Sequence, residues 1–403
     1  MERLKEIIRQ KTLDNIDLDR DISDEELYVI IDRVINTHGK TEYISIRDKQ
    51  RLRTDVYNAI RKLDILQELL DDSSITEIMV NGPDKIFIEK DGAILPYEKH
   101  FESRQKLEDL IQQMVSHSNR IINEASPIVD SRLPDGSRVN VVLPPVALEG
   151  PIITIRKFPD MPLTMEKLIE MESITAEAAD FIRLLVVAGY NIFISGGTGS
   201  GKTTFLNVLS NFIPQSERII TIEDAAELQI RNIPNLVRLE VRTGNTEGNI
   251  GISIRDLIKT SLRMRPDRII VGEVRDEAAI DLLQALNTGH DGSFSTGHAN
   301  SPADMLSRLE TLVLMGADIP LMAVRRQIVS AIDIIVHLGR LRDRSRRVLE
   351  ITEVLDLRNG EYFMNPIYAF VEKGEDKNRI IGKLEKVGDL KYTEKLNRAG
   401  IRL

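Results

Sequence analysis

The stretch ISGGTGSGKTT, at residues 194–204, decides the fold of this chain. Its glycines stand at positions 196, 197, 199 and 201. Glycine at this density weakens helices and strands alike, so the backbone here must adopt conformations that other residues avoid. The apolar run YNIFIS, at 190–195, precedes the stretch, and apolar residues at helical spacing follow it, namely Phe205, Val208, Leu209 and Phe212. The pattern therefore predicts a strand, a glycine-rich turn and a helix in succession.

The turn fits the phosphate-loop pattern G-x-x-x-x-G-K-[ST] over residues 196–203. Glycines let successive backbone N–H groups point at phosphate oxygens, and the following helix adds the positive end of its dipole. We expect Lys202 to contact the β- and γ-phosphates of ATP and the Thr203 hydroxyl to bind Mg²⁺. A chance glycine-rich turn would not need the flanking strand and helix. The residues predicted to bind the nucleotide are Gly196, Gly197, Thr198, Gly199, Ser200, Gly201, Lys202, Thr203 and Thr204.

Acidic residues end two further apolar runs, RIITIE at 218–223 and RIIVGE at 268–273. Apolar runs that alternate with helical stretches indicate a parallel sheet covered on both faces. In such a sheet the carboxyl ends of the strands collect beside the phosphate loop, so we expect Glu223, Asp224 and Glu273 there. We assign Glu273 to Mg²⁺, directly or through water, and expect another acid to orient or deprotonate the attacking water. A helix N-cap is the competing interpretation for Asp224.

The loop TGHDGSFSTGHANSP, at 288–302, holds His290 and His298. It is rich in glycine and follows the helical stretch EAAIDLLQALN at 277–287. Such a loop could sense the γ-phosphate of a bound nucleotide. A metal site is the weaker interpretation, because the chain has no Cys and the local sequence supplies no clear carboxylate ligands.

The composition limits the class of protein. A chain of 403 residues with 42% hydrophobic and 29% charged residues predicts two or three globular domains. The net charge of −9 argues against nucleic acid as the main ligand. The lack of Cys excludes disulfides and fits a reducing compartment. No apolar run reaches the roughly 18 residues of a membrane span, and the charged start MERLKEIIRQ lacks a signal-peptide core, so docking at a membrane would require a partner.

The pattern along the chain predicts three domains. Residues 1–70 carry apolar stripes at helical spacing and predict a helical bundle. Residues 71–160 combine short β-rich segments with one helix and predict a compact α+β domain. A linker is expected near residues 159–162, within FPDMPLTMEKL. Residues 165–403 alternate strands with helices and then return to strands, which predicts an α/β nucleotide-binding domain with a C-terminal extension.

Four stretches together resemble the motifs of the secretion ATPases: the phosphate loop, TIEDAAEL at 221–228, RPDRIIVGEVRD at 265–276 and TGHDGSFSTGHANSP. In that family they are the Walker A motif, the Asp box, the Walker B motif and the His box, in this order. The resemblance covers roughly residues 65–345. It is greatest to the CpaF-type ATPases of tight-adherence (Flp) pilus assembly. A chain without Cys cannot carry the zinc module of several type II ATPases, and conjugation-type chains are usually shorter.

The resemblance implies a RecA-like P-loop NTPase domain and an ATP-hydrolysing homo-hexamer that powers pilus assembly or protein secretion. It places such a motor in the cytoplasm, peripheral at the inner face of the cytoplasmic membrane, with membrane platform proteins as partners. Glu223 would be the acid that activates water, Glu273 the Walker B acid, and His290 and His298 the His-box pair. The arginines that approach the nucleotide in related motors would match three positions of the amino-terminal domain, with a surface ion pair as the alternative for each: Arg132, Arg138 and Arg156.

Other functions stay open on the sequence. They are a conjugation-type motor that assists DNA or protein transfer, a nucleotide-gated scaffold with little turnover, and a small-molecule phosphotransferase, for which no acceptor pocket is evident. The arginine-rich stretch GRLRDRSRRVLE, at 339–350, predicts either a hairpin between strands or a docking surface for an acidic or membrane-embedded partner. In the second case, charge reversal at Arg344 and Arg346 would impair assembly and leave hydrolysis intact.

Overall fold

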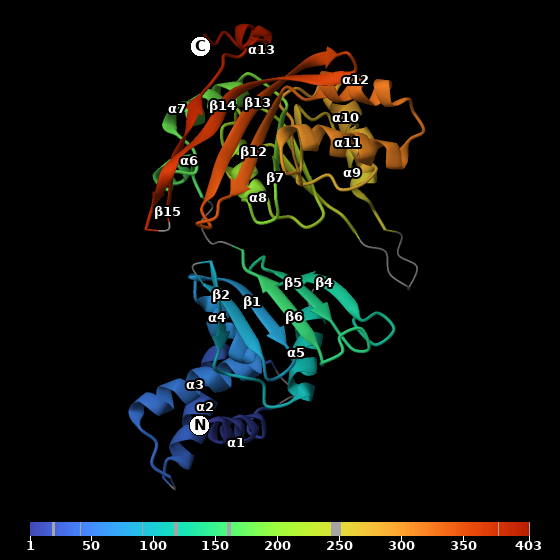
Figure 1. Ribbon diagram of the computed structural model, residues 1–403. Coiled ribbons are helices and arrows are strands. Elements are labelled where there is room, and N and C mark those ends of the chain that lie inside the picture. Colours follow the sequence, from blue (N-terminus) through green and yellow to red (C-terminus); the bar gives the residue numbers. More distant parts are fainter. Residues whose placement is uncertain are drawn as a thin grey trace. The chain divides into compact units, whose positions relative to one another are not determined.

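The computed structural model describes residues 1–17, 21–40, 42–90, 92–116, 120–158, 163–242, 251–377 and 379–402. The chain forms two compact units, Met1–Asp160 and Met161–Leu403 (Figure 1). The linker expected near residues 159–162 lies outside the described residues. A further boundary near residue 70, inside the first unit, stays a prediction.

Helices begin the first unit. α1 (Glu2–Leu13), α2 (Asp24–His38) and α3 (Ile46–Arg61) pack around a core that includes Ile8, Leu27, Ile31, Leu52 and Val56. A capping box of Ser23 and Glu26 satisfies backbone N–H groups at the start of α2. α3 ends at Arg61, although apolar residues at helical spacing continue with Leu63 and Leu66. A 3₁₀ turn, η1 (Asp64–Leu66), and α4 (Gln67–Asp71) follow it.

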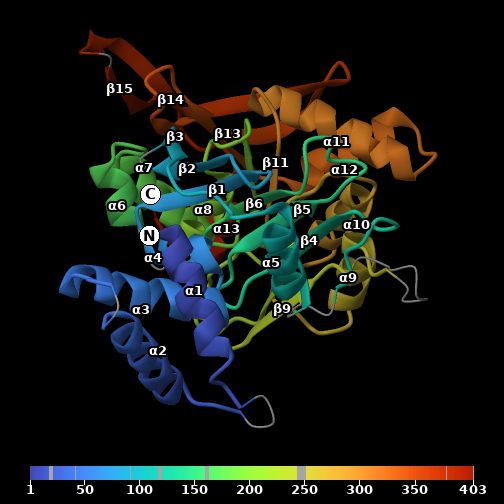
Figure 2. The same cartoon turned by 90° about the horizontal axis from the view of Figure 1, so that it is seen from below.

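A six-stranded antiparallel sheet completes the first unit, in the order β3-β2-β1-β6-β5-β4. Its strands are β1 (Ile75–Asn81), β2 (Ile86–Lys90), β3 (Ala93–Tyr97), β4 (Ile128–Arg132), β5 (Arg138–Val142) and β6 (Ile152–Arg156). α5 (Arg104–Ser116) shares a hydrophobic core with one face of this sheet (Figure 2). Since side chains alternate along a strand, residues next to the core positions Val139 and Ile155 lie on the opposite face.

The second unit contains a nine-stranded sheet in the order β15-β14-β13-β12-β7-β11-β10-β8-β9. Six strands are parallel: β7 (Ile192–Gly196), β8 (Ile219–Glu223), β9 (Leu236–Glu240), β10 (Arg268–Val271), β11 (Phe294–Gly297) and β12 (Ile334–Arg340). β13 (Arg346–Arg358), β14 (Glu361–Asp376) and β15 (Arg379–Lys386) extend the sheet in antiparallel fashion. The three apolar runs noted in the sequence become β7, β8 and β10.

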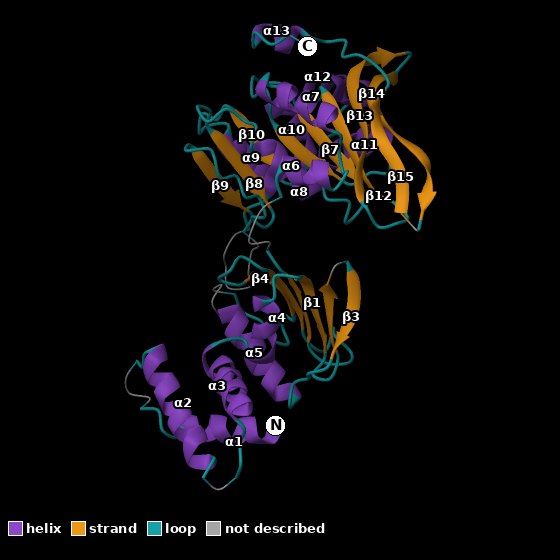
Figure 3. Cartoon of the chain, turned by 90° about the vertical axis from the view of Figure 1, so that its left-hand side faces the viewer, coloured by secondary structure: helices purple, strands orange, loops and turns teal. Residues whose placement is uncertain are grey.

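Helices cover both faces of this sheet (Figure 3). α6 (Met165–Glu170), α7 (Ala176–Val187) and α8 (Lys202–Ser210) pack on one face. α9 (Ile254–Ser261), α10 (Ala278–Leu286), α11 (Pro302–Gly316) and α12 (Leu321–Ala331) pack on the other. A short helix, α13 (Glu394–Arg398), lies near the C-terminus. β7 shows the double coverage, because Ile192 and Ile194 belong to the first hydrophobic core and Phe193 to the second. The predicted α/β fold class is confirmed.

Within the described ranges, none of the helices has the length and apolar character needed to cross a lipid bilayer.

Candidate nucleotide-binding site

The predicted phosphate loop connects the carboxyl end of β7 to α8, and β7 lies between β11 and β12. Gly196 and Gly199 show why the loop requires residues without a side chain. Gly199 has φ +70°, in the left-handed region, and a Cβ on Gly196 would collide with the carbonyl oxygen of Leu338. Around Gly197 and Gly199, by contrast, a Cβ would meet no atom within 4 Å. The loop is therefore tightly packed at its base and open at its tip.

The start of α8 offers backbone N–H groups to an anion. Gly201 is the N-cap residue and has no side chain that could accept hydrogen bonds from them. Nearby, the hydroxyl of Ser200 is buried and has no hydrogen-bond partner among the described residues. Thr203 and Thr204 are half-buried in the first turn, and Thr198 is exposed at the tip of the loop. This set of donors fits the phosphates of a nucleotide.

Lys202, the first residue of α8, points back into the loop. Its ammonium group donates to the carbonyl oxygens of Gly196, at 3.0 Å, and Gly197, at 2.9 Å. It also lies 3.3 Å from Nδ1 of His298. The side chain is only 8% exposed, and this burial lowers the pKa of Lys202. The cation is thus held inside the loop by neutral oxygen atoms.

A connected series of polar side chains continues from Lys202 across the ends of three strands. Nε2 of His298, just after β11, lies 3.2 Å from Oε1 of Glu273. The other carboxylate oxygen of Glu273 accepts a hydrogen bond from Arg275, at 2.7 Å. Arg275 in turn lies 3.7 Å from the carboxylate of Asp224, which follows β8. Burial and the charge of Lys202 lower the pKa of His298. The phosphate loop, the histidine loop and two predicted acids therefore form one polar cluster.

Glu223, the last residue of β8, is 3% exposed. Oε2 of its carboxylate accepts hydrogen bonds from the backbone N–H groups of Glu227, at 2.6 Å, and Leu228, at 2.8 Å. Oε1 is buried and has no hydrogen-bond partner in the described part of the chain. Burial raises the pKa of Glu223 to about 7, against the effect of the two N–H groups. Its carboxyl group is thus fixed in orientation and can carry a proton near neutral pH.

The two predicted histidines lie at opposite ends of β11. His298 follows the strand and belongs to the polar cluster, whereas His290 precedes it and contacts the carbonyl oxygen of Ala285, at 3.0 Å. The four residues of β11 alone rise about 13 Å between them. The structure therefore brings His298 to the phosphate loop and leaves His290 at the amino edge of the sheet. That this loop senses the γ-phosphate stays a prediction, and His298 is the histidine of the pair that lies beside the lysine of the phosphate loop.

The three predicted arginines are neighbours in the sheet of the first unit. Arg138 on β5 is paired directly with Arg132 on β4 and with Arg156 on β6. Directly paired residues share a face, and here it is the face opposite the core of α5. Arg156 is also hydrogen-bonded to Glu77 on β1, at 2.9 Å. These residues form an arginine row on one face of the sheet; their function toward a nucleotide stays a prediction.

Sequence reasoning missed two residues of the second unit. Arg275 contacts both Glu273 and Asp224. Its position two residues after Glu273 could have indicated that it belongs to the site. His337 is buried on β12. A histidine that interrupts an otherwise apolar run could have indicated a buried polar contact in the sheet. In the described ranges, no group of three or more His, Asp or Glu side chains is placed to hold a metal ion by itself.

Comparison with known proteins agrees with this geometry. A family model for type II/IV secretion system proteins matches residues 60–372. The conjugal transfer protein TrbB of Rhizobium radiobacter is 34% identical over 331 residues, covering 78% of this chain and 95% of that protein. The type IV secretion system protein PtlH of Bordetella pertussis is 33% identical over 316 residues, covering 72% and 93%. The crystal structure of the pilus retraction motor PilT with bound ADP matches 84% of this chain and 85% of its own, with a TM-score of 0.52 and 19% identity, and shows a shared fold.

Proposed function

The chain belongs to the family of type II/IV secretion system proteins, and we propose on this basis that it is an ATP-hydrolysing motor for pilus assembly or protein secretion. The observation that carries the proposal is the polar cluster from Lys202 through His298 to Glu273. A loop that only stabilised the fold would not need acids and a histidine gathered around its lysine. A phosphoryl-transfer site needs such groups, because its catalysis consists mostly of positioning and electrostatic stabilisation.

ATP binding would use the groups that are already oriented in the loop. The nucleotide-binding set is residues 196–204, with backbone N–H groups as the main donors. A phosphate oxygen carries more negative charge than the carbonyl oxygens of Gly196 and Gly197, so it would replace them as the partner of Lys202. An anion at this position would also favour the charged form of the lysine, against the effect of burial.

Mg²⁺ fits the oxygen donors of this site. A hydroxyl at Thr203 and a carboxylate at Glu273 are the hard ligands that Mg²⁺ prefers, and phosphates would complete its shell. Because the described side chains form no closed metal site of their own, we expect the ion to arrive with the nucleotide. When bound, Mg²⁺ neutralises charge that develops on the phosphate oxygens.

Glu223 is suited to accept a proton from the attacking water. Its Oε1 has no partner among the described residues, and its Oε2 is fixed by two backbone N–H groups. A general base works best with a pKa near the working pH, and the pKa of about 7 at Glu223 meets this condition. We therefore assign water activation to Glu223 and Mg²⁺ binding to Glu273.

The arginine row supplies candidate arginine fingers. Three guanidinium groups lie at directly paired positions on one face of the sheet, and this concentration of positive charge suits an anion such as a nucleotide phosphate. One or more of Arg132, Arg138 and Arg156 would approach the nucleotide, in the same or a neighbouring subunit. An arginine finger contributes about 10³- to 10⁵-fold in rate. This contribution would couple movement of the first unit to hydrolysis.

The assembly that we propose is a homo-hexamer of the CpaF type, located in the cytoplasm at the inner face of the cytoplasmic membrane. Membrane platform proteins of a pilus or secretion system would be its partners. The N-terminal helices α1–α3 and the C-terminal stretch KLEKVGDLKYTEKLNRAGI, at 383–401, support the CpaF type, since both lie almost entirely outside the residues 60–372 that the family model matches.

Hydrolysis of magnesium-ATP by the purified protein tests the proposal. Lys202→Ala should abolish turnover, while Lys167→Ala, which removes an exposed lysine on α6, should leave it unchanged. Thermal unfolding of both variants should match that of the wild type. Normal turnover in Lys202→Ala would show that the phosphate loop is not the site of hydrolysis.

A conjugation-type motor is the second candidate function, and the 34% identity to a conjugal transfer protein favours it. Single-stranded DNA should stimulate hydrolysis in that case. A motor for pilus assembly or protein secretion should respond to its membrane platform proteins and not to DNA. The net charge of −9 argues for the second outcome.

A further inference from the structure

Arg346 contacts the phosphate loop from a distant part of the chain. It is the first residue of β13, and its Nε donates to the carbonyl oxygen of Gly199, at 2.9 Å, across 147 positions of sequence. Its Cδ lies 3.6 Å from the point that a Cβ on Gly201 would occupy. The side chain therefore runs along the glycines that lead into α8.

The sheet itself puts Arg346 in this place. β12 pairs with β7 so that Leu338 lies opposite Gly196, the first residue of the phosphate loop. β12 also pairs with β13 so that Arg340 lies opposite Arg346. The hairpin between these two strands is therefore held beside the phosphate loop by the backbone pairing of β12 with both β7 and β13. The arginine-rich stretch is a hairpin between strands, as one of its two interpretations predicts.

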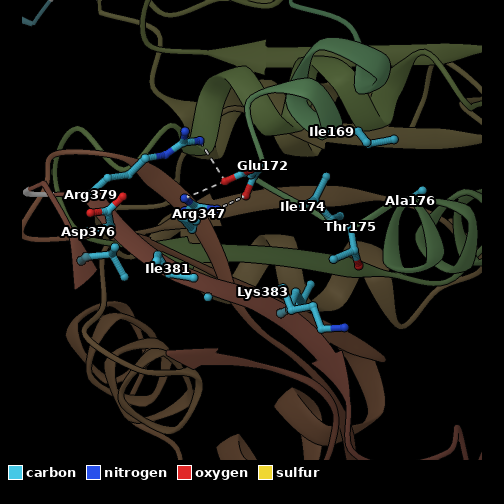
Figure 4. A pocket seen from close by; sticks show the side chains of 13 residues that line it. Ile169, Glu172, Ile174, Thr175, Ala176, Arg347, Asp376, Arg379, Ile381 and Lys383 are labelled. Atoms are coloured by element: carbon cyan, nitrogen blue, oxygen red, sulfur yellow. Dashed lines mark hydrogen bonds and ion pairs between the residues drawn. The ribbon is translucent and has the colours of Figure 1, made fainter. Parts of the chain in front are cut away.

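Arg347, the residue after Arg346, anchors the start of β13 by contacts with Glu172. The side chain of Arg347 is 2% exposed. It donates to the backbone carbonyl oxygen of Glu172, at 2.7 Å, and to Oε2 of the same residue, at 3.2 Å. Both residues line a cavity of about 500 Å³ beside β15. Figure 4 shows their contact, with Arg379 also directed at Glu172. The hydrogen bonds of Arg347 therefore help to hold the start of β13, which carries Arg346, in its position.

Arg346 differs in its charge pairing from two other arginines of the hairpin, Arg342 and Arg347. Arg342 pairs with Glu372 and Glu375, and Arg347 pairs with Glu172. For Arg346, the bond to Gly199 is the one hydrogen bond or ion pair that the described residues provide. A guanidinium group has five N–H donors. The four on its terminal nitrogens thus lie next to a loop whose own donors fit an anion, and no carboxylate of the described residues forms an ion pair with Arg346.

We propose that Arg346 is a further nucleotide-binding residue, which contacts a phosphate oxygen of the nucleotide held in the phosphate loop of the same subunit. The inference rests on the proposed function and adds to it a cation from the C-terminal extension. It differs from the alternative in which Arg344 and Arg346 belong to a docking surface, where charge reversal would impair assembly and leave hydrolysis intact. A nucleotide would thereby bridge the phosphate loop and the β12–β13 hairpin.

Three substitutions test this role. Arg346→Gln keeps an N–H group that can donate to Gly199 but removes the charge, Arg346→Lys keeps the charge, and Arg346→Ala removes both. The matched control is Arg344→Asn, which removes an exposed arginine two residues away, at φ +67°, a conformation that Asn tolerates. Isothermal calorimetry with magnesium-ATP and with inorganic pyrophosphate measures binding, and steady-state kinetics give KM and kcat separately.

We expect Arg346→Gln and Arg346→Ala to weaken the binding of both ligands about ten- to a hundredfold, the range of one hydrogen bond to a charged group. KM should rise by a similar factor with kcat within about twofold, because the contact exists before and during the reaction. Arg346→Lys should retain part of the affinity, and Arg344→Asn should bind like the wild type.

Wild-type affinity in Arg346→Gln would overturn the inference, since it would show that the arginine only holds the carbonyl oxygen of Gly199. Weakened ATP binding with unchanged pyrophosphate binding would also overturn it, because the contact would then not be to phosphate. A wild-type protein that binds no ATP would instead overturn the proposed function. The two failures are therefore distinguishable.

Discussion

The hydroxyl oxygen of Ser195, near the end of β7, lies 2.8 Å from Nδ1 of His337 on the neighbouring strand β12. The two residues are paired directly in the parallel ladder, and both side chains are buried. Burial lowers the pKa of His337, while a hydrogen bond to the backbone of Asn300 acts in the opposite direction. Burial thus favours the neutral form of the imidazole. The imidazole connects the strand that leads into the phosphate loop with the segment that follows His298.

Removing the hydroxyl group should destabilise the second unit. Ser195→Ala leaves Nδ1 of His337 buried without its partner, which costs about 1–3 kcal/mol in the free energy of unfolding. Denaturant unfolding measures this loss, with the exposed Ser216→Ala as the control. A loss below about 0.5 kcal/mol in Ser195→Ala would mean that water or a rotated ring replaces the bond.

Glu223 should make stability depend on pH. Its pKa is about 7 in the folded chain, against an ordinary value of 4.5. Between these two pH values the folded state binds more protons than the unfolded state, so stability falls as the pH rises from about 4.5 to 7. This pKa difference corresponds to about 3 kcal/mol. Unfolding measured over this pH range should show the fall in the wild type, and Glu223→Gln should reduce it. An equal fall in both proteins would assign the effect to other groups.

The same substitution should separate binding from hydrolysis. Glu223→Gln keeps an oxygen that can accept the two backbone N–H groups but cannot take a proton from water. We expect kcat to fall at least about a hundredfold, with ATP affinity unchanged. In the wild type, kcat should rise with pH through about 7, where the carboxyl group loses its proton. A Glu223→Gln protein with wild-type kcat would remove this residue from the catalytic step.

The two histidines should differ in importance. His298→Ala removes the group that lies between Lys202 and Glu273, so we expect ATP turnover to fall at least about tenfold. His290→Ala is the matched control from the same loop. It changes a residue at the opposite end of β11 and should keep turnover within about twofold. Equal losses in the two variants would contradict the separation that the structure shows.

Substitution in the arginine row should lower kcat and spare ATP binding. Ala at Arg132, Arg138 and Arg156, one position at a time, should reduce kcat by about 10³-fold or more where the residue is a finger. Arg104→Ala on α5 is the control, since Arg104 is exposed and pairs with Glu108 of its own helix. If all three variants kept the wild-type kcat, none of these arginines would act as an arginine finger.

Much of the site could be predicted because its groups lie in short contiguous motifs. The spacing around Lys202 and the acids at the ends of apolar runs report on local backbone geometry, and the structure gathers them at one edge of the sheet. His290 and His298 show the limit of this reasoning. Eight positions apart in a glycine-rich loop, they appear equivalent in sequence, but a four-residue strand lies between them and directs them to opposite edges.

The sequence by itself determined the phosphate loop, the buried parallel strands and the acids that end them, because each depends on the periodicity and chemistry of neighbouring residues. Only the tertiary structure decided which distant side chains lie beside the phosphate loop and the strand that leads into it. The order and register of β7, β12 and β13 bring His337 to Ser195 and Arg346 to Gly199. Strand order results from long-range packing of the sheet between its two layers of helices, and no local pattern encodes a contact across 147 positions.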